Sequence, residues 1–106
     1  MKITSHEVIV VNVPMDAALM GRTESPHTIL RLRTDDGIEG IGWAFMFGAM
    51  GPALAKALDG VAELLHGEDP MLRERIDGIV DAATSGSGPG MSHYVRAVIN
   101  FAVWDI

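Results

Sequence analysis

The C-terminal segment of the sequence is apolar around most of the circumference that it would have as a helix. Between Val95 and Ile106 the strongly polar residues are Arg96, Asn100 and Asp105. Arg96 and Asn100 lie one helical turn apart on the same side, whereas Asp105 falls on the opposite side. A helix of this kind is normally buried on more than one side. We therefore expect one flank to cover the rest of the fold and another to lie against a partner.

A small chain can hide only part of this apolar surface. Burying a large side chain such as Phe101 or Trp104 contributes roughly 1.5–3 kcal/mol, against a total stability of about 5–15 kcal/mol for a native domain. The sequence has 106 residues, of which 48% are hydrophobic, and this is enough for one modest core. We therefore expect the chain to be a fragment of a larger protein whose remaining part covers the terminal helix.

Charge and composition exclude several classes of function. The net charge is -6 and the only lysines are Lys2 and Lys56, so the chain lacks the clustered cations that a nucleic-acid surface needs. The absence of cysteine excludes disulfides and thiolate metal sites. The apolar run from Val8 to Val11 is too short to cross a bilayer, and the N-terminus does not resemble a signal peptide. We expect a soluble cytoplasmic protein without nucleic-acid or membrane partners.

The first part of the sequence predicts an antiparallel sheet. A β-branched run from Val8 to Val13 stops at Pro14, which cannot donate a hydrogen bond to a neighbouring strand. From Thr28 to Thr34 apolar and polar residues alternate, as in a strand with one buried face. Asp35-Asp36-Gly37 supplies a tight turn. The predicted strands cover about residues 2–13, 27–34 and 38–46, with a longer connection between the first two.

Two glycines in the third predicted strand share one face. Gly40 and Gly42 alternate with Ile41 and Trp43, which point to the other face. A strand without side chains on one face allows another element to approach its backbone closely.

The second part of the sequence predicts three helices, at about residues 52–66, 70–83 and 91–106. The first two carry apolar stripes at helical spacing. The stripes are Leu54, Leu58, Val61 and Leu65 in the first, and Leu72, Ile76, Ile79 and Ala83 in the second. Asp69 and Pro70 fit the N-cap and first residue of the second helix. The predicted fold class is therefore α+β: a three-stranded antiparallel meander followed by three helices.

Three segments carry a resemblance to a known family. They are Arg33–Gly42 (RTDDGIEGIG), Leu64–Pro70 (LLHGEDP) and Ala97–Ile106 (AVINFAVWDI). Their order and spacing, across nearly the whole chain, resemble the N-terminal capping domain of the mandelate racemase/muconate lactonizing enzyme family in the enolase superfamily.

The resemblance implies an enzyme whose chemistry lies outside these residues. In that family a C-terminal (β/α)₇β barrel, absent from this chain, holds Mg²⁺ and supplies the bases that remove the proton α to a substrate carboxylate. No catalytic residue or metal ligand is then expected in this chain, and the chain alone would be inactive. The partners implied are the barrel, a carboxylate-bearing small molecule and further copies of the protein in a homo-oligomer. The implied reaction is racemisation or dehydration of a hydroxy acid or acid sugar.

The capping role would belong to two segments, at about residues 15–26 and 45–51. The substrate-facing candidates in and beside them are Met20, Arg22, His27, Phe45 and Phe47. Arg22 could clamp a substrate carboxylate, or it could be a solvated arginine that pairs with Glu24. The methionines and phenylalanines could line an adaptable lid, or they could belong to the core. The four histidines show no spacing typical of a metal site.

Two alternatives remain open from the sequence. The chain could be a free-standing binding or assembly module that performs no catalysis and buries its last helix in a homo-oligomer. It could also belong to a cycloisomerase or dipeptide epimerase of the same superfamily, which would share the fold and differ in the capping segments and the barrel.

Overall fold

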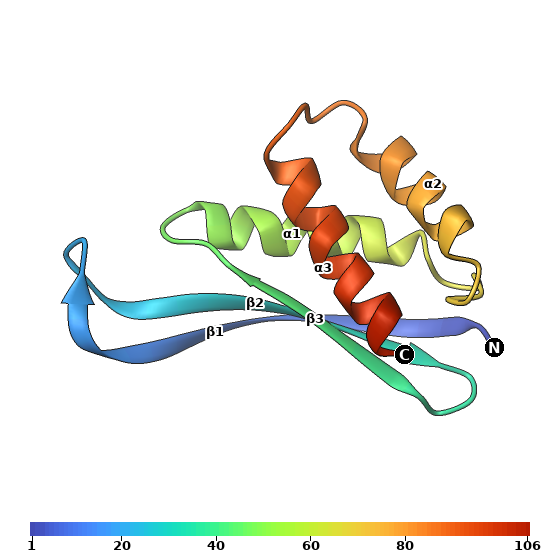
Figure 1. Ribbon diagram of the computed structural model, residues 1–106, viewed down its shortest axis with the longest axis horizontal. Coiled ribbons are helices and arrows are strands. Elements are labelled where there is room, and N and C mark those ends of the chain that lie inside the picture. Colours follow the sequence, from blue (N-terminus) through green and yellow to red (C-terminus); the bar gives the residue numbers. More distant parts are fainter.

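The computed structural model describes residues 1–106 and contains an antiparallel sheet followed by helices (Figure 1). The elements are β1 (Ile3–Leu19), β2 (Arg22–Thr34), β3 (Glu39–Phe45), α1 (Met50–Glu63), α2 (Arg73–Thr84) and α3 (Met91–Asp105). The strands are ordered β1-β2-β3 and neighbours are antiparallel. The α+β class predicted from the sequence is confirmed. No helix is long and apolar enough to cross a membrane.

The alternation in β2 separates a buried face from an open one. Leu30 and Leu32 are completely buried under the helices, whereas Arg31 and Arg33 lie on the other face, where both contact Glu39 of β3. The core that the helices form over the sheet contains fifteen buried residues: Ile3, Leu30, Leu32, Leu54, Leu58, Val61, Ala62, Leu65, Ile76, Val80, Val95, Val98, Ile99, Ala102 and Val103.

An irregularity near the start of β1 changes which side chains face the helices. Ile3 pairs with Thr34 and Ser5 with Arg33, so Thr4 is an extra residue in the ladder. Ile3 and His6 are three positions apart and would point to opposite faces of a regular strand. Because the bulge shifts the alternation by one residue, both are turned towards the helices. The side chain of His6 is only 7% exposed.

The prediction that β1 ends at Pro14 is wrong. β1 is an edge strand and continues to Leu19, and Pro14 pairs with Glu24 of β2. An edge strand tolerates proline because one row of its amide groups needs no partner. What was predicted to be a loop at residues 15–26 is therefore the outer half of a long hairpin. Its turn is formed by Met20 and Gly21, with φ of 52° and 76°, the two positive values that a type I′ turn requires.

The hairpin extends well beyond the helices and gives the molecule its length of 44 Å (Figure 1). Val10, Val11 and Val13 are all about two-fifths exposed. The outer part of the hairpin, from Asn12 to Pro26, is called the arm below.

Helix α3 lies directly on β3, and glycine makes this possible. A Cβ atom at Gly42 would lie 1.9 Å from the carbonyl oxygen of Val98, and one at Gly40 would lie 2.0 Å from that of Ala102. No side chain fits in such a space. The close approach predicted from these two glycines is confirmed.

The first two helices differ from their predicted bounds. Helix α1 begins at Met50 and ends at Glu63, and its predicted stripe is buried. Helix α2 begins at Arg73 rather than at Pro70. Asp69 instead closes a turn, in which its side chain accepts a hydrogen bond from the amide of Met71 at 2.9 Å.

The predicted stripe of α2 is wrong at both of its ends. Leu72 is 55% exposed and Ala83 is exposed, whereas Ile76 and Val80 are buried. Only the middle of this short helix is buried, because α2 packs mainly against α3 and lies away from the sheet (Figure 1).

Helix α3 keeps an apolar flank in solvent, as its composition predicts. Val95, Val98, Ile99, Ala102 and Val103 face the core. Phe101 is 57% exposed and Trp104 is 69% exposed.

Candidate functional site

The arm and the β3–α1 loop, residues 46–49, enclose an open hollow at one end of the molecule. Its volume is about 420 Å³, within the range of small-molecule sites. The lining residues come from three parts of the chain: Val10, Asn12, Gly21, Arg22, Thr23, Glu24 and Pro26 of the hairpin, Phe47 and Gly48 of the loop, and Pro52 of α1. The structure thus brings together the two segments predicted to cap a substrate.

Arg22 joins these two segments physically. Its guanidinium carbon lies 5.1 Å from the centroid of the Phe47 ring, within the distance of a cation–π contact. Gly48 has a φ of 66°, and a Cβ atom there would be 3.6 Å from a terminal nitrogen of Arg22. No salt bridge forms between Arg22 and Glu24. The contact places the guanidinium beside the ring, and its N–H groups can still donate hydrogen bonds to an anion.

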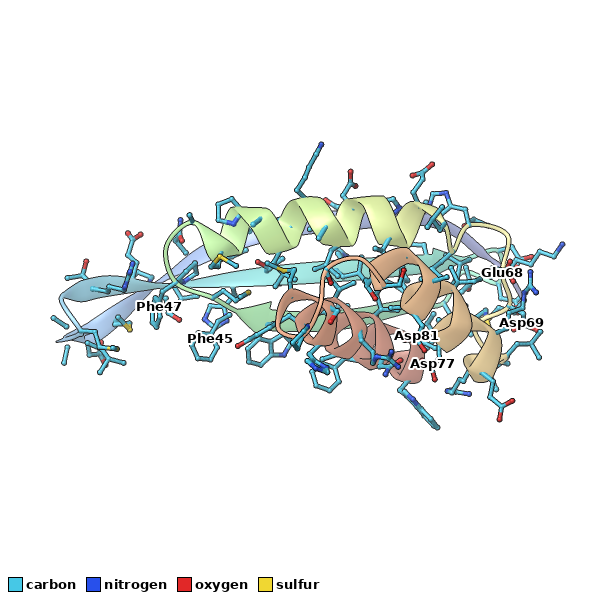
Figure 2. All side chains as sticks on the ribbon, turned by 90° about the horizontal axis from the view of Figure 1, so that it is seen from above. Phe45, Phe47, Glu68, Asp69, Asp77 and Asp81 are labelled. Atoms are coloured by element: carbon cyan, nitrogen blue, oxygen red, sulfur yellow. The ribbon has the colours of Figure 1, made fainter.

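An aromatic row continues from Phe47 onto the open face of the sheet. Phe45 and Phe47 meet edge to face with centroids 5.8 Å apart, and they lie side by side in Figure 2. The ring of His27 lies 5.9 Å from that of Phe45 and 5.4 Å from that of Trp43. Ser25 holds the His27 ring through a hydrogen bond of 3.1 Å between its hydroxyl and Nε2.

A second hollow lies beside this row, between β3 and α3. Its volume is about 560 Å³ and all of its lining residues are apolar: Trp43, Ala44, Phe45, Met46, Phe47, Met50, Tyr94, Ala97 and Phe101. A small-molecule site normally includes a few polar groups that orient the ligand. The only polar side-chain groups among these residues are the hydroxyl of Tyr94 and the indole N–H of Trp43, so the hollow is better suited to docking another apolar surface than to chemistry.

The predicted site residues are not all brought together. Arg22, His27, Phe45 and Phe47 form one connected set. Met20 lies at the tip of the arm and is 86% exposed, without a contact to that set.

The donor atoms near the arm do not suit Mg²⁺. This ion prefers several oxygen ligands in octahedral geometry. Glu24 is the only carboxylate among the residues that line the hollow of the arm. The surface can therefore contact an anion but offers no magnesium site.

Two further clusters were not predicted. The first lies on the open face of the sheet, where Arg31 and Arg33 both donate to Glu39, at 2.7 Å and 2.9 Å, and Arg33 also donates to Glu7 at 3.0 Å. Hydrogen bonds from Arg31 above all hold the pKa of Glu39 below its ordinary value of 4.5. The alternation of β2 places both arginines on this face, but only the register of three strands identifies their partners.

The second cluster joins β1 to the end of α1. The spacing of the histidines in the sequence indicates no metal site, but the structure places His6 Nδ1 2.8 Å from His66 Nε2. Asp59 and Glu63 lie beside them. The spacing of Asp59, Glu63 and His66 along a helix was a readable signal, whereas the addition of His6 depends on the bulge in β1.

Comparison with known proteins gives one family and a group of similar folds. Residues 2–106 match the N-terminal domain of the mandelate racemase/muconate lactonizing enzyme family. No curated protein sequence matches the chain significantly.

Solved structures share the fold over almost the whole chain. A racemase from Streptomyces coelicolor A3(2) with bound magnesium has a TM-score of 0.88 and 19% identity, over 96% of this chain and 30% of that one. An L-talarate/galactarate dehydratase from Salmonella typhimurium LT2, liganded with Mg and L-lyxarohydroxamate, has a TM-score of 0.86 and 24% identity, over 97% and 29%. An isomerase from Streptomyces coelicolor A3(2) has a TM-score of 0.78 and 30% identity, over 97% and 26%. The chain therefore spans less than a third of the length of these structures.

Proposed function

The chain belongs to the mandelate racemase/muconate lactonizing enzyme family, as its N-terminal domain, and on this basis we propose that it caps the active site of a larger enzyme. The observation that carries the proposal is the stacking of Arg22 on Phe47, because this contact joins the arm and the β3–α1 loop into one surface. That surface combines a fixed cation with an aromatic row, the two properties needed to hold an anionic substrate and to exclude water.

The substrate proposed is a small hydroxy acid or acid sugar. Structural neighbours include a racemase with bound magnesium and a talarate/galactarate dehydratase, and racemisation and dehydration can both begin with loss of the proton α to a carboxylate. In the complete enzyme Mg²⁺ would stabilise the negative charge that develops on that carboxylate. Its ligands, and the base, are proposed to lie in a C-terminal barrel, with the complete protein forming a homo-oligomer.

Within this scheme Arg22 binds the end of the substrate that does not react. A guanidinium group can hold a carboxylate through two parallel hydrogen bonds, and the ring of Phe47 restricts the orientation of that group. Arg22 would therefore favour substrates that carry a second carboxylate over those with only one.

The aromatic row would separate the reacting end from solvent. Phe45 and Phe47 carry no polar atoms, and their edge-to-face contact makes a continuous apolar strip. Expelling water strengthens electrostatic interactions at the reacting atoms. His27, at the far end of the strip, would add a polar contact to a substrate hydroxyl.

The test uses the complete protein that contains this domain. A panel of mono- and dicarboxylic hydroxy acids, including galactarate, is incubated with the protein and Mg²⁺ in deuterated water, and exchange of the α-proton is followed by NMR. We expect exchange or dehydration with at least one dicarboxylate. Replacing Arg22 with alanine should raise the KM for that substrate about 10–100-fold, because a hydrogen bond to a charged group contributes about 1.5–3 kcal/mol.

Lys56→Ala is the matched control, since it removes one cation from an exposed position on α1 and should leave the KM unchanged. Arg22→Lys should recover only part of the affinity, because lysine cannot form the bidentate contact. An absence of exchange and of dehydration across the panel would overturn the proposed reaction. An equal KM for wild type and Arg22→Ala would overturn the clamp.

A further inference from the structure

A group of metal-ligating side chains lies far from the arm, between the start of β1 and the end of α1. His6, Glu63 and His66 each present one ligand atom, and these atoms all lie within 4.8 Å of one another. We propose that they bind a divalent transition-metal ion of the Zn²⁺ class. This site would be separate from the active site that the arm covers, and it does not depend on the proposed function.

The geometry of the two imidazoles is close to that of a zinc site. His6 Nδ1 and His66 Nε2 are 2.8 Å apart. Zinc–nitrogen bonds of about 2.0–2.1 Å in a tetrahedral arrangement place two nitrogen ligands about 3.3 Å apart. An opening of roughly half an ångström, which small rotations of the two rings provide, is enough to admit the ion between them.

Asp59 prepares His6 to act as a ligand. Its Oδ1 lies 2.8 Å from Nε2 of His6, and a carboxylate can only accept a hydrogen bond there. Nε2 therefore carries the proton of the neutral ring, and Nδ1 presents a lone pair towards His66. A carboxylate behind a metal-binding histidine is a common arrangement, because it fixes the tautomer and strengthens the ligand.

His66 and Glu63 complete the donor set. Because Nδ1 of His6 accepts, His66 donates from Nε2, and metal binding requires this proton to move to Nδ1 of His66, which lies 4.0 Å from Glu63. This step is a change of tautomer, so the number of protons on the ring does not change. His66 is one-third exposed and Glu63 is two-thirds exposed, so water can occupy a fourth position.

The backbone holds the two parts of the site together without a metal. The amide of Gly67 donates to the carbonyl oxygen of Ile3 at 2.8 Å. The amide of Ile3 donates in turn to the carbonyl oxygen of Glu68 at 2.9 Å. His66 is therefore fixed beside β1 by its neighbours in sequence. A preorganised site loses less conformational entropy when the ion binds.

The chemistry of the donors distinguishes this ion from magnesium. Two imidazole nitrogens and one carboxylate oxygen suit Zn²⁺, Co²⁺ or Ni²⁺, whereas Mg²⁺ prefers oxygen ligands. The site also lies at the opposite end of the molecule from the capping surface: Glu68, two residues after His66, and Phe47 are far apart in Figure 2. A metal there would fasten α1 to β1.

The experiment is a calorimetric titration of the tag-free protein with Zn²⁺ near neutral pH, in excess Mg²⁺, together with the visible absorption spectrum of the Co²⁺ form. We expect saturable binding of one Zn²⁺ per chain that Mg²⁺ does not displace. Asp59→Asn should weaken binding about 10–100-fold, as loss of such a supporting carboxylate does elsewhere. His66→Ala should weaken it further and abolish the Co²⁺ absorption bands. Circular dichroism of each variant checks that it is folded.

His93→Ala is the matched control, because it removes an exposed histidine at the start of α3 and should leave the affinity unchanged. Since the side chain of His6 is only 7% exposed, its replacement could disturb packing. His66 and the exposed Glu63 are therefore the positions tested, with Glu63→Gln as the second ligand variant. The proposal is overturned if the wild type shows no saturable Zn²⁺ binding in the micromolar range, or if folded His66→Ala and Glu63→Gln bind Zn²⁺ as tightly as His93→Ala does.

Discussion

Glu39 is the centre of an ion network on the open face of the sheet. It accepts hydrogen bonds from Arg31 and Arg33 of β2, and Arg33 also donates to Glu7 of β1. Each member of this network is at least a quarter exposed. Water therefore screens the attraction, and the network contributes modestly to stability while fixing the strands in register.

The lowered pKa of Glu39 predicts how this contribution varies with pH. The carboxyl of Glu39 has a lower pKa in the folded chain than its ordinary value of 4.5. Its stabilising effect is therefore complete when the pH is above 4.5. The effect is lost as the pH falls from 4.5 through the folded pKa. Glu39→Gln should therefore lower the midpoint of urea unfolding at neutral pH and have little effect at acidic pH. A difference that is the same at both pH values would contradict this.

Glu24→Gln serves as the control for that measurement, since Glu24 is exposed, lies in the arm and forms no salt bridge. It should leave the unfolding midpoint close to that of the wild type at both pH values.

At the scale of whole elements, helix α3 lies in direct contact with the backbone of β3. Carbonyl groups of α3 lie against bare backbone at Gly40 and Gly42. Asp105 adds a polar tie, because its carboxylate accepts a hydrogen bond from the amide of Ile41 at 2.9 Å. β3 is an edge strand, and this bond satisfies one of its free amides.

Adding a single methyl group at this contact should separate the two elements. In Gly42→Ala the new Cβ atom would overlap the carbonyl oxygen of Val98, 1.9 Å away, and overpacking of this kind costs about 1–3 kcal/mol. Gly60→Ala is the matched control, because nothing lies within 4 Å of a Cβ atom there. It should stabilise the chain by about 0.5–1 kcal/mol, since glycine is unfavourable inside a helix. The midpoint of urea unfolding should fall in Gly42→Ala and rise in Gly60→Ala. Equal shifts of the midpoint in the two variants would show that the space around Gly42 does not limit its side chain.

Local patterns in the sequence predict the elements of this fold better than their ends. The alternation in β2 and the apolar stripe of α1 directly reflect which side chains are buried, so both elements could be predicted from the sequence. The end of β1 was not, because the effect of Pro14 depends on whether its strand lies at an edge, which only the assembled sheet determines. The start of α2 was missed because Asp69 and Pro70 suit a turn as well as a helix N-terminus.

The residues of the candidate site could be selected from the sequence, but the contacts between them could not. Arg22 and Phe47 could be selected because the family resemblance implies a capping role for the two segments in which they lie. Their contact with each other depends on how the arm and the loop meet in space. The His6–His66 contact depends on the bulge in β1, which no residue in the sequence indicates. Contacts between segments distant in sequence were thus the part that the sequence left open.

The whole molecule has two apolar surfaces that its own core does not cover. One is the hollow between β3 and α3, and the other is the outer flank of α3 near Trp104. The guanidinium carbon of Arg73 lies 3.8 Å from the centroid of the Trp104 ring. Contiguous exposed apolar surface of this kind typically marks an interaction site. It agrees with a domain that covers a larger neighbour.

From the apolar hollow between β3 and α3 we predict that the chain associates with itself when it is studied alone. Phe101 is 57% exposed at the edge of the apolar hollow, so Phe101→Lys should reduce self-association in sedimentation velocity experiments. Leu64→Lys is the control, because Leu64 is similarly exposed but lies at the end of α1, outside the hollow. A wild-type chain that remains monomeric at all concentrations tested would contradict the prediction.

The arm has a consequence for how such a domain can diversify. Beyond Val13 its two strands pair only with each other, and its tip, at Met20, touches nothing in the body of the protein. Substitutions and changes in length there leave the hydrophobic core as it was, so they carry little penalty for folding. Changes at the tip can therefore alter the surface that the arm presents without disturbing the packing of the core.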